Sequence, residues 1–113
     1  MPITGIFAEV CVADFERSED WYSKFFGREP DDRPMDGLVQ WRNGPAGFQV
    51  WRDAEKAGHS VSTIVVSSME EERSRLKAAG LHLRPDQDSG GGVIAQIEDP
   101  DGNLLTLAEP PRS

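Results

Sequence analysis

The side chain most able to do chemistry in this chain is a carboxylate, Glu9. It lies in an alternating run near the N-terminus, with Phe7 and Cys11 two positions away on either side. Alternation of this kind predicts a β-strand in which the three side chains share one face. A carboxylate between apolar neighbours is costly unless it is hydrated, hydrogen-bonded or paired. We interpret Glu9 either as a ligand-binding anion or general base, or as half of an ion pair with Arg42 or Arg52.

Two tryptophans and an amide suggest a wall for a planar ligand. Trp41 and Trp51 fall at similar places in adjacent predicted strands, and alternation puts Gln49 on the same face as Trp51. Indoles and amides together form a flat, amphipathic surface, although packing within the sheet or at a subunit interface is the alternative. The predicted ligand-binding set consists of side chains expected on inner strand faces: Phe7, Glu9, Trp41, Gln49, Trp51, Thr63, Gln96 and Thr106.

Other reactive residue types are interpreted as structural. His59 precedes a strand beside a glycine, and His82 lies in a short predicted strand, so we expect both to be solvated. Cys11 has no histidine or basic residue near it in sequence, which argues against a nucleophilic role. Trp21 lies on a predicted helix, where packing or an interface accounts for it.

The elements that would position these residues form two similar halves. The first begins with a strand over residues 3–12, followed by a helix that Asp14 caps and that ends near Phe26 at Gly27. The second begins with a strand over residues 61–66. Its helix is capped by Ser67 or Ser68, with Glu71 completing a capping box, and ends at Gly80.

The two halves align at a constant spacing of 54 residues, as between Val10 and Ile64, which indicates a duplication. After each helix come short predicted strands, so each half reads as βαβββ. The segments 29–34 and 86–92 are polar and rich in glycine or proline, and we predict loops there. Predicted strands after the helices cover residues 37–42, 47–51, 81–83, 92–98 and 104–108.

A run of turn residues ends the second half. Asp99-Pro100-Asp101-Gly102-Asn103 predicts a tight turn that leads into the final strand. Together with segments 12–18, 21–22, 26–27 and 78–81, it resembles the vicinal oxygen chelate superfamily over residues 3–109. This superfamily includes glyoxalase I, bleomycin resistance proteins and extradiol dioxygenases. The resemblance implies an α+β fold in which two βαβββ modules form a curved mixed β-sheet cup, or half-barrel, with helices on the outside.

The resemblance also implies where a metal would be held. Metal-binding members use a histidine or similar ligand in the first strand of each module and a glutamate in the last strand. The corresponding positions here are Phe7, Val61, Thr106 and either Gln49 or Trp51, and none of these is a good ligand. We therefore predict no metal and no other cofactor.

Composition limits the partners and the location. The chain has 113 residues and a formal net charge of -8, which disfavours nucleic acid and favours cationic small molecules. No apolar run approaches the length of a membrane span, and no signal peptide is recognisable. We predict a cytoplasmic protein with one domain over residues 1–113, made of module 3–52 and module 60–109.

Three functions are compatible with these features. The first is metal-independent binding of a small aromatic or cationic molecule in the cup. The second is an enzyme, either a metal-free isomerase or lyase with Glu9 as base, or a glyoxalase- or dioxygenase-like protein with unrecognised metal ligands. The third is a domain for assembly or regulation. A curved sheet from so short a chain leaves edges uncovered, and superfamily members of this length commonly complete their sites across a two-fold interface, so we predict a homodimer.

Overall fold

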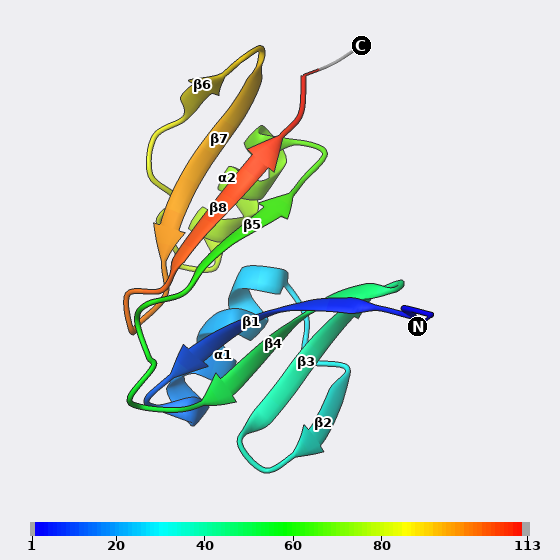
Figure 1. Cartoon of the computed structure of the whole chain (residues 1–113). Helices are drawn as coiled ribbons and strands as arrows, with labels where there is room; N and C mark the ends of the chain where they lie inside the picture. Colours follow the sequence, from blue (N-terminus) through cyan, green and yellow to red (C-terminus); the bar gives the residue numbers. More distant parts are fainter. Residues whose placement is uncertain (1, 112–113) are drawn as a thin grey trace.

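Two modules with the same element order make up the computed structural model, which describes residues 2–111 (Figure 1). The first contains β1 (Ile6–Val12), α1 (Phe15–Phe26), β2 (Asp32–Met35), β3 (Leu38–Asn43) and β4 (Ala46–Arg52). The second contains β5 (Val61–Val65), α2 (Met69–Ala78), β6 (Gln87–Ser89), β7 (Gly92–Glu98) and β8 (Leu104–Glu109). The predicted pair of βαβββ modules is confirmed.

Each module forms its own four-stranded open sheet. The strand orders are β1-β4-β3-β2 and β5-β8-β7-β6, so the two modules have the same topology. The leading strand of each sheet runs parallel to its neighbour, β4 or β8, and the remaining pairs are antiparallel. Figure 1 shows each helix lying against one face of its own sheet. The opposite face of each sheet, here called the strand face, is left without a helix.

Local capping chemistry sets the helix bounds as predicted. The side chain of Asp14 accepts a hydrogen bond from the backbone N–H of Arg17 and begins α1, and Gly27 ends it with a φ of 75°. Ser68 begins α2 by accepting from the N–H of Glu71 at 3.2 Å. Side-chain acceptors satisfy backbone donors that the first helical turn leaves unpaired.

Two strands form where loops are predicted, and one predicted strand is absent. The segments 29–34 and 86–92 contain the start of β2 and the whole of β6, both short, polar edge strands. Residues 81–83 form no strand, because the guanidinium of Arg73 binds the carbonyls of Leu83 and Arg84. The N–H of Leu81 also returns to the carbonyl of Leu76 at the end of α2.

The core lies between the helices and the helix-facing sides of the sheets. Buried side chains from both modules belong to a single apolar cluster, which includes Val10, Tyr22, Phe25, Leu76 and Leu105. Burial of apolar surface on this scale is the main source of stability in a chain of this size.

The turn Asp99–Asn103 joins the modules by hydrogen bonds. Asn103 is fully buried, and its Nδ2 donates to the carbonyl of Cys11 at 2.8 Å. The hydroxyl of Tyr22 donates to Asp99 at 2.7 Å, and burial together with the Asp99 charge raises the pKa of Tyr22 far above its usual range. The hydroxyl therefore stays protonated and keeps donating. The turn residues predicted from sequence thus hold α1 and β1 of the first module.

Among the helices of residues 2–111, none is both long enough and apolar enough to span a bilayer.

Candidate functional site

The strand face of the first sheet carries a row of polar residues, with Phe7 in the row on one side and Trp51 in the row on the other. Strand pairing aligns Glu9 with Gln49, Gln49 with Gln40, and Gln40 with Asp32. We call these four residues the polar row. Phe7, Gly47 and Arg42 lie in the row on one side, and Cys11, Trp51 and Leu38 lie in the row on the other. Residues at aligned positions of neighbouring strands share a face, so β1, β4, β3 and β2 together position two carboxylates and two amides in one row.

Glu9 is exposed, and within residues 2–111 its carboxylate makes no ion pair or hydrogen bond. The ion-pair interpretation is wrong for this part of the chain, because Arg42 pairs with Asp32 and Arg52 pairs with Asp36. The two arginines that could have paired with Glu9 thus form their ion pairs with aspartates instead. Glu9 therefore presents an available anion on the strand face.

An aromatic ring lies close to the polar row on one side. Phe7 is 36% exposed, and its ring covers Gly47 so closely that a Cβ at that glycine would lie 2.6 Å from the ring. A side chain larger than glycine at this position would displace the ring. Phe7 is thus held flat over β4, beside Glu9.

Trp51 and Cys11 form the other side. Trp51 is half-buried on the strand face, where it is aligned with Cys11. Burial, and then the charge of Glu9, raises the pKa of the Cys11 thiol. A thiol that is buried and held protonated is a poor nucleophile. Cys11 is therefore not suited to act as a nucleophile.

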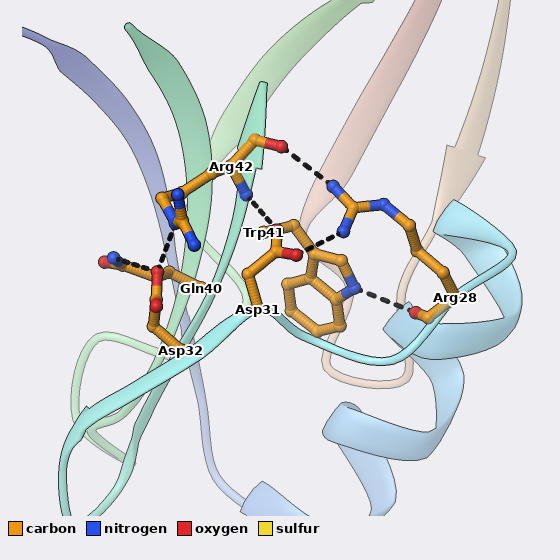
Figure 2. A network of polar contacts seen from close by, with 6 residues as sticks. All are labelled: Arg28, Asp31, Asp32, Gln40, Trp41 and Arg42. Atoms are coloured by element: carbon orange, nitrogen blue, oxygen red, sulfur yellow. Dashed lines mark hydrogen bonds and ion pairs between the residues drawn. The ribbon is translucent and has the colours of Figure 1, made fainter. Parts of the chain in front are cut away.

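Trp41 does not lie with the other predicted ligand-binding residues. It is 3% exposed on the α1 side of β3, and its indole N–H donates to the carbonyl of Arg28 at 2.9 Å. Figure 2 shows the ring of Trp41 on that side and the side chain of Gln40 on the other. The predicted wall of two indoles is wrong. The reason is the β3–β4 register, which aligns Trp41 with Phe48 and Trp51 with Leu38 on the opposite face.

The strand face of the second sheet carries a similar row of polar side chains, but without a carboxylate. Thr63 is aligned with Thr106, and Thr106 with Gln96, whose Nε2 donates to the threonine hydroxyl at 3.2 Å. Val61 and Val65, on either side of Thr63, are 72% and 68% exposed. The predicted residues Thr63, Gln96 and Thr106 are thus brought together with each other in one sheet, as Phe7, Glu9, Gln49 and Trp51 are in the other.

The donors available in these rows do not fit a transition metal. Thr106 is aligned with Thr63, and Gln49 with Glu9. The aligned set then offers one carboxylate, one amide and two hydroxyls, without the imidazoles or thiolates that bind zinc, nickel or iron well. Within residues 2–111, no three His, Cys, Asp or Glu side chains gather to hold a metal ion.

A hollow among residues 2–111 lies apart from the polar row. It has a volume of about 520 Å³ and is lined on one side by Ala8, Phe26 and Phe48 and on the other by Ile64 and neighbouring residues of β5. Of the predicted ligand-binding residues, only Trp41 and Thr63 line it. In a single chain, Glu9 and Gln49 lie on an open sheet surface and not in this hollow.

The remaining chemically interesting residues take structural places. His59 and His82 are exposed. Trp21 stacks on Phe25 along α1, with ring centroids 5.4 Å apart. Sequence reasoning left Gln40 and Asp32 out of the predicted site. A two-residue β3–β4 turn would have identified Gln40 as the partner of Gln49, whereas nothing in the local sequence marked β2 as a strand.

Solved structures of known proteins have the same fold. A glyoxalase/bleomycin resistance protein from Catenulispora acidiphila matches with a TM-score of 0.88 and 26% identity, over 95% of this chain and 98% of its own. TnmS3, an antibiotic binding protein from a Streptomyces species, has a TM-score of 0.79 and 22% identity, with coverage of 97% and 98%. A bleomycin-binding protein complexed with bleomycin has a TM-score of 0.75 and 17% identity, with coverage of 97% and 99%.

No family model matches the sequence, and no curated protein matches it significantly. The structural neighbours match nearly the whole of both chains. The paired βαβββ modules, the turn Asp99–Asn103 and this full-length likeness place the chain in the vicinal oxygen chelate superfamily.

Proposed function

We propose that this protein binds, without a metal, a small molecule that combines an aromatic ring with a cationic group. The observation that carries the proposal is Glu9, an exposed carboxylate with no ion pair in residues 2–111, on a strand face that also holds Phe7 and Trp51. An anion beside aromatic surface is complementary to an aromatic cation. The formal net charge of -8 adds long-range attraction for such a ligand.

Two structural neighbours support ligand binding as the activity. One is described as an antibiotic binding protein, and another is a bleomycin-binding protein complexed with bleomycin. The shared fold by itself does not assign a ligand, because one scaffold hosts many functions. The choice of an aromatic cation for this chain rests on its own residues.

We expect Glu9→Gln to weaken binding of benzamidinium, a small aromatic cation, about tenfold or more, because a hydrogen bond to a charged group contributes about 1.5–3 kcal/mol. Added salt should weaken binding to the original protein more than to the variant. The measurement is an NMR titration of the labelled protein. Glu70→Gln removes the same charge from an exposed position on α2 and serves as the control. Equal affinities of Glu9→Gln and Glu70→Gln would contradict the proposal.

We also propose that the binding surface is completed in a homodimer. Two valines on the strand face of the second sheet are exposed, Val61 at 72% and Val65 at 68%. The radius of gyration is 14.3 Å, whereas a compact chain of this length has about 13 Å. Exposed apolar surface on open strand faces favours burial against a second copy.

The double variant Val61→Glu/Val65→Glu should therefore sediment as a monomer at tens of micromolar, roughly the range where a typical dimer persists, while the original chain sediments as a dimer. A pair of buried, unpaired carboxylates is strongly unfavourable at an interface. Ala54→Glu, at an exposed position after β4, tests whether an added charge is enough by itself and should leave the dimer intact. A monomeric original chain would rule out the dimer.

A further inference from the structure

The amides of the polar row are linked in one direction. Gln49 donates from Nε2 to the Oε1 of Gln40 at 2.8 Å, and Gln40 donates from its own Nε2 to the carboxylate of Asp32 at 2.9 Å. An ionised carboxylate can only accept hydrogen bonds. Asp32 therefore requires the nitrogen of Gln40 to point toward β2, which leaves the oxygen of Gln40 pointing toward β4. That oxygen in turn requires the nitrogen of Gln49, so one carboxylate sets the orientation of two amides.

Asp32 is held as an anion by its surroundings. Arg42 donates from Nε to the same carboxylate at 2.6 Å (Figure 2). Hydrogen bonds from Gln40 and then from Arg42 lower the pKa of Asp32 below its usual range. The neighbouring Asp31 fixes the strand itself, because it accepts from the backbone N–H of Arg42 at 2.6 Å and from the guanidinium of Arg28. Asp32, at one end of the polar row, is thus a hydrogen-bond acceptor at neutral pH.

The other end of the row is left with acceptors. One N–H of Gln49 is used toward Gln40, and the Oε1 of Gln49 accepts no hydrogen bond within residues 2–111. Glu9 is the aligned residue on the adjacent parallel strand, and its carboxylate is also free there. Neighbouring strands lie about 4.8 Å apart, so the two side chains that carry these acceptors occupy neighbouring positions on the same face.

We propose that Gln49 is a specificity-determining residue, which together with Glu9 selects ligands with two adjacent N–H donors, such as an amidinium or guanidinium group. We further assign Asp32 as the positioning residue that sets this selectivity from two strands away. This inference rests on the proposed function of the strand face and names the chemical class that the face prefers. A planar amidinium can donate to both acceptors at once. A carboxamide of the same shape would set its carbonyl oxygen against one of them and leave a polar group unpaired.

The experiment compares benzamidinium with benzamide, which differ by the replacement of one N–H₂ group by oxygen. Dissociation constants for both are measured by NMR titration at pH 7, and their ratio is the selectivity. The original chain should prefer benzamidinium by about tenfold or more. Gln49→Met, which keeps the length of the side chain but has no strong acceptor, should reduce that ratio several-fold, although Glu9 still supplies its charge.

Asp32→Asn is the decisive variant. Asparagine keeps the shape of the side chain but can donate, so the amides of Gln40 and Gln49 become free to reverse. The selectivity ratio should then fall several-fold, although Asp32 contacts no ligand. Asp36→Asn is the matched control, since it also removes a carboxylate paired with an arginine on the neighbouring strands, but outside the polar row. Thermal unfolding of each variant establishes that it is folded.

The possible outcomes distinguish a failure of this inference from a failure of the proposed function. If Asp32→Asn and Asp36→Asn lower the ratio equally, the orientation of the amides has no effect and the inference is overturned, while binding itself stands. If neither probe binds the original chain, or if Glu9→Gln leaves both affinities unchanged, the proposed function and this inference fail together. A fall in the ratio for Gln49→Met and Asp32→Asn, but not for Asp36→Asn, supports the assignment.

Discussion

Replacing Trp41 with alanine should lower the free energy of unfolding by about 3–5 kcal/mol, the usual cost of removing a large buried aromatic side chain. The indole is 3% exposed and packs on Phe26, with ring centroids 5.1 Å apart. Its N–H also satisfies the carbonyl of Arg28 at the end of α1. The cavity left by the indole and the lost hydrogen bond both lower the free energy of unfolding. Urea unfolding measures the change, with the slope of the transition compared between variants.

The matched variant Trp51→Ala separates stability from binding. Trp51 is half-buried on the strand face, so its removal should cost about 1 kcal/mol of stability. It should nevertheless weaken benzamidinium binding several-fold, because stacking or cation–π contact contributes about 0.5–2 kcal/mol. The folded fraction of the Trp41→Ala variant should bind benzamidinium with nearly the same affinity as the original chain. The opposite pattern, with Trp51 needed for stability and Trp41 for binding, would contradict the placement of the two rings.

The register of one hairpin explains why sequence reasoning put both tryptophans on one face. Alternation within β4 correctly groups Gln49 with Trp51, and alternation within β1 correctly groups Phe7 with Glu9. Which residues of β3 join them depends on the turn. Asn43 is aligned with Ala46 across a turn of two residues, so Trp41 meets Phe48. A turn longer or shorter by one residue would reverse the faces of β3.

The strands that escaped prediction share a physical cause. β2 contains Pro34, and β6 consists of Gln87, Asp88 and Ser89, so neither has the apolar alternation that marks a strand. Both are edge strands that form because β3 or β7 offers an unpaired edge. Edge strands commonly carry proline and polar residues. The helices were predictable because their capping residues are next to them in sequence. Asp32 joins the polar row only because β2 pairs with β3, which the local sequence does not indicate.

Asn103→Ala should lower the free energy of unfolding of the whole chain by about 3 kcal/mol, since each buried partner left unsatisfied costs about 1–3 kcal/mol. The side chain of Asn103 donates to Cys11 in the first module and to Asp99, and it accepts from the backbone N–H of Ser60 at 2.9 Å. Alanine replaces none of these hydrogen bonds. Asn43→Ala, at an exposed asparagine in the β3–β4 hairpin, is the control and should change stability by less than about 0.5 kcal/mol.

The same variant tests whether the two modules unfold as one unit, as the predicted single domain requires. All three tryptophans (Trp21, Trp41 and Trp51) lie in the first module, whereas Asn103 lies in the second. Tryptophan fluorescence therefore reports the first module, and far-ultraviolet circular dichroism reports both. If the turn couples them, the two signals should give coincident urea transitions, and Asn103→Ala should shift both to lower urea by the same amount. A variant in which circular dichroism shifts while the tryptophan transition stays in place would show that the modules unfold independently. The hydrogen bonds from Asn103 to Cys11 and from Tyr22 to Asp99 would then be contacts without coupling.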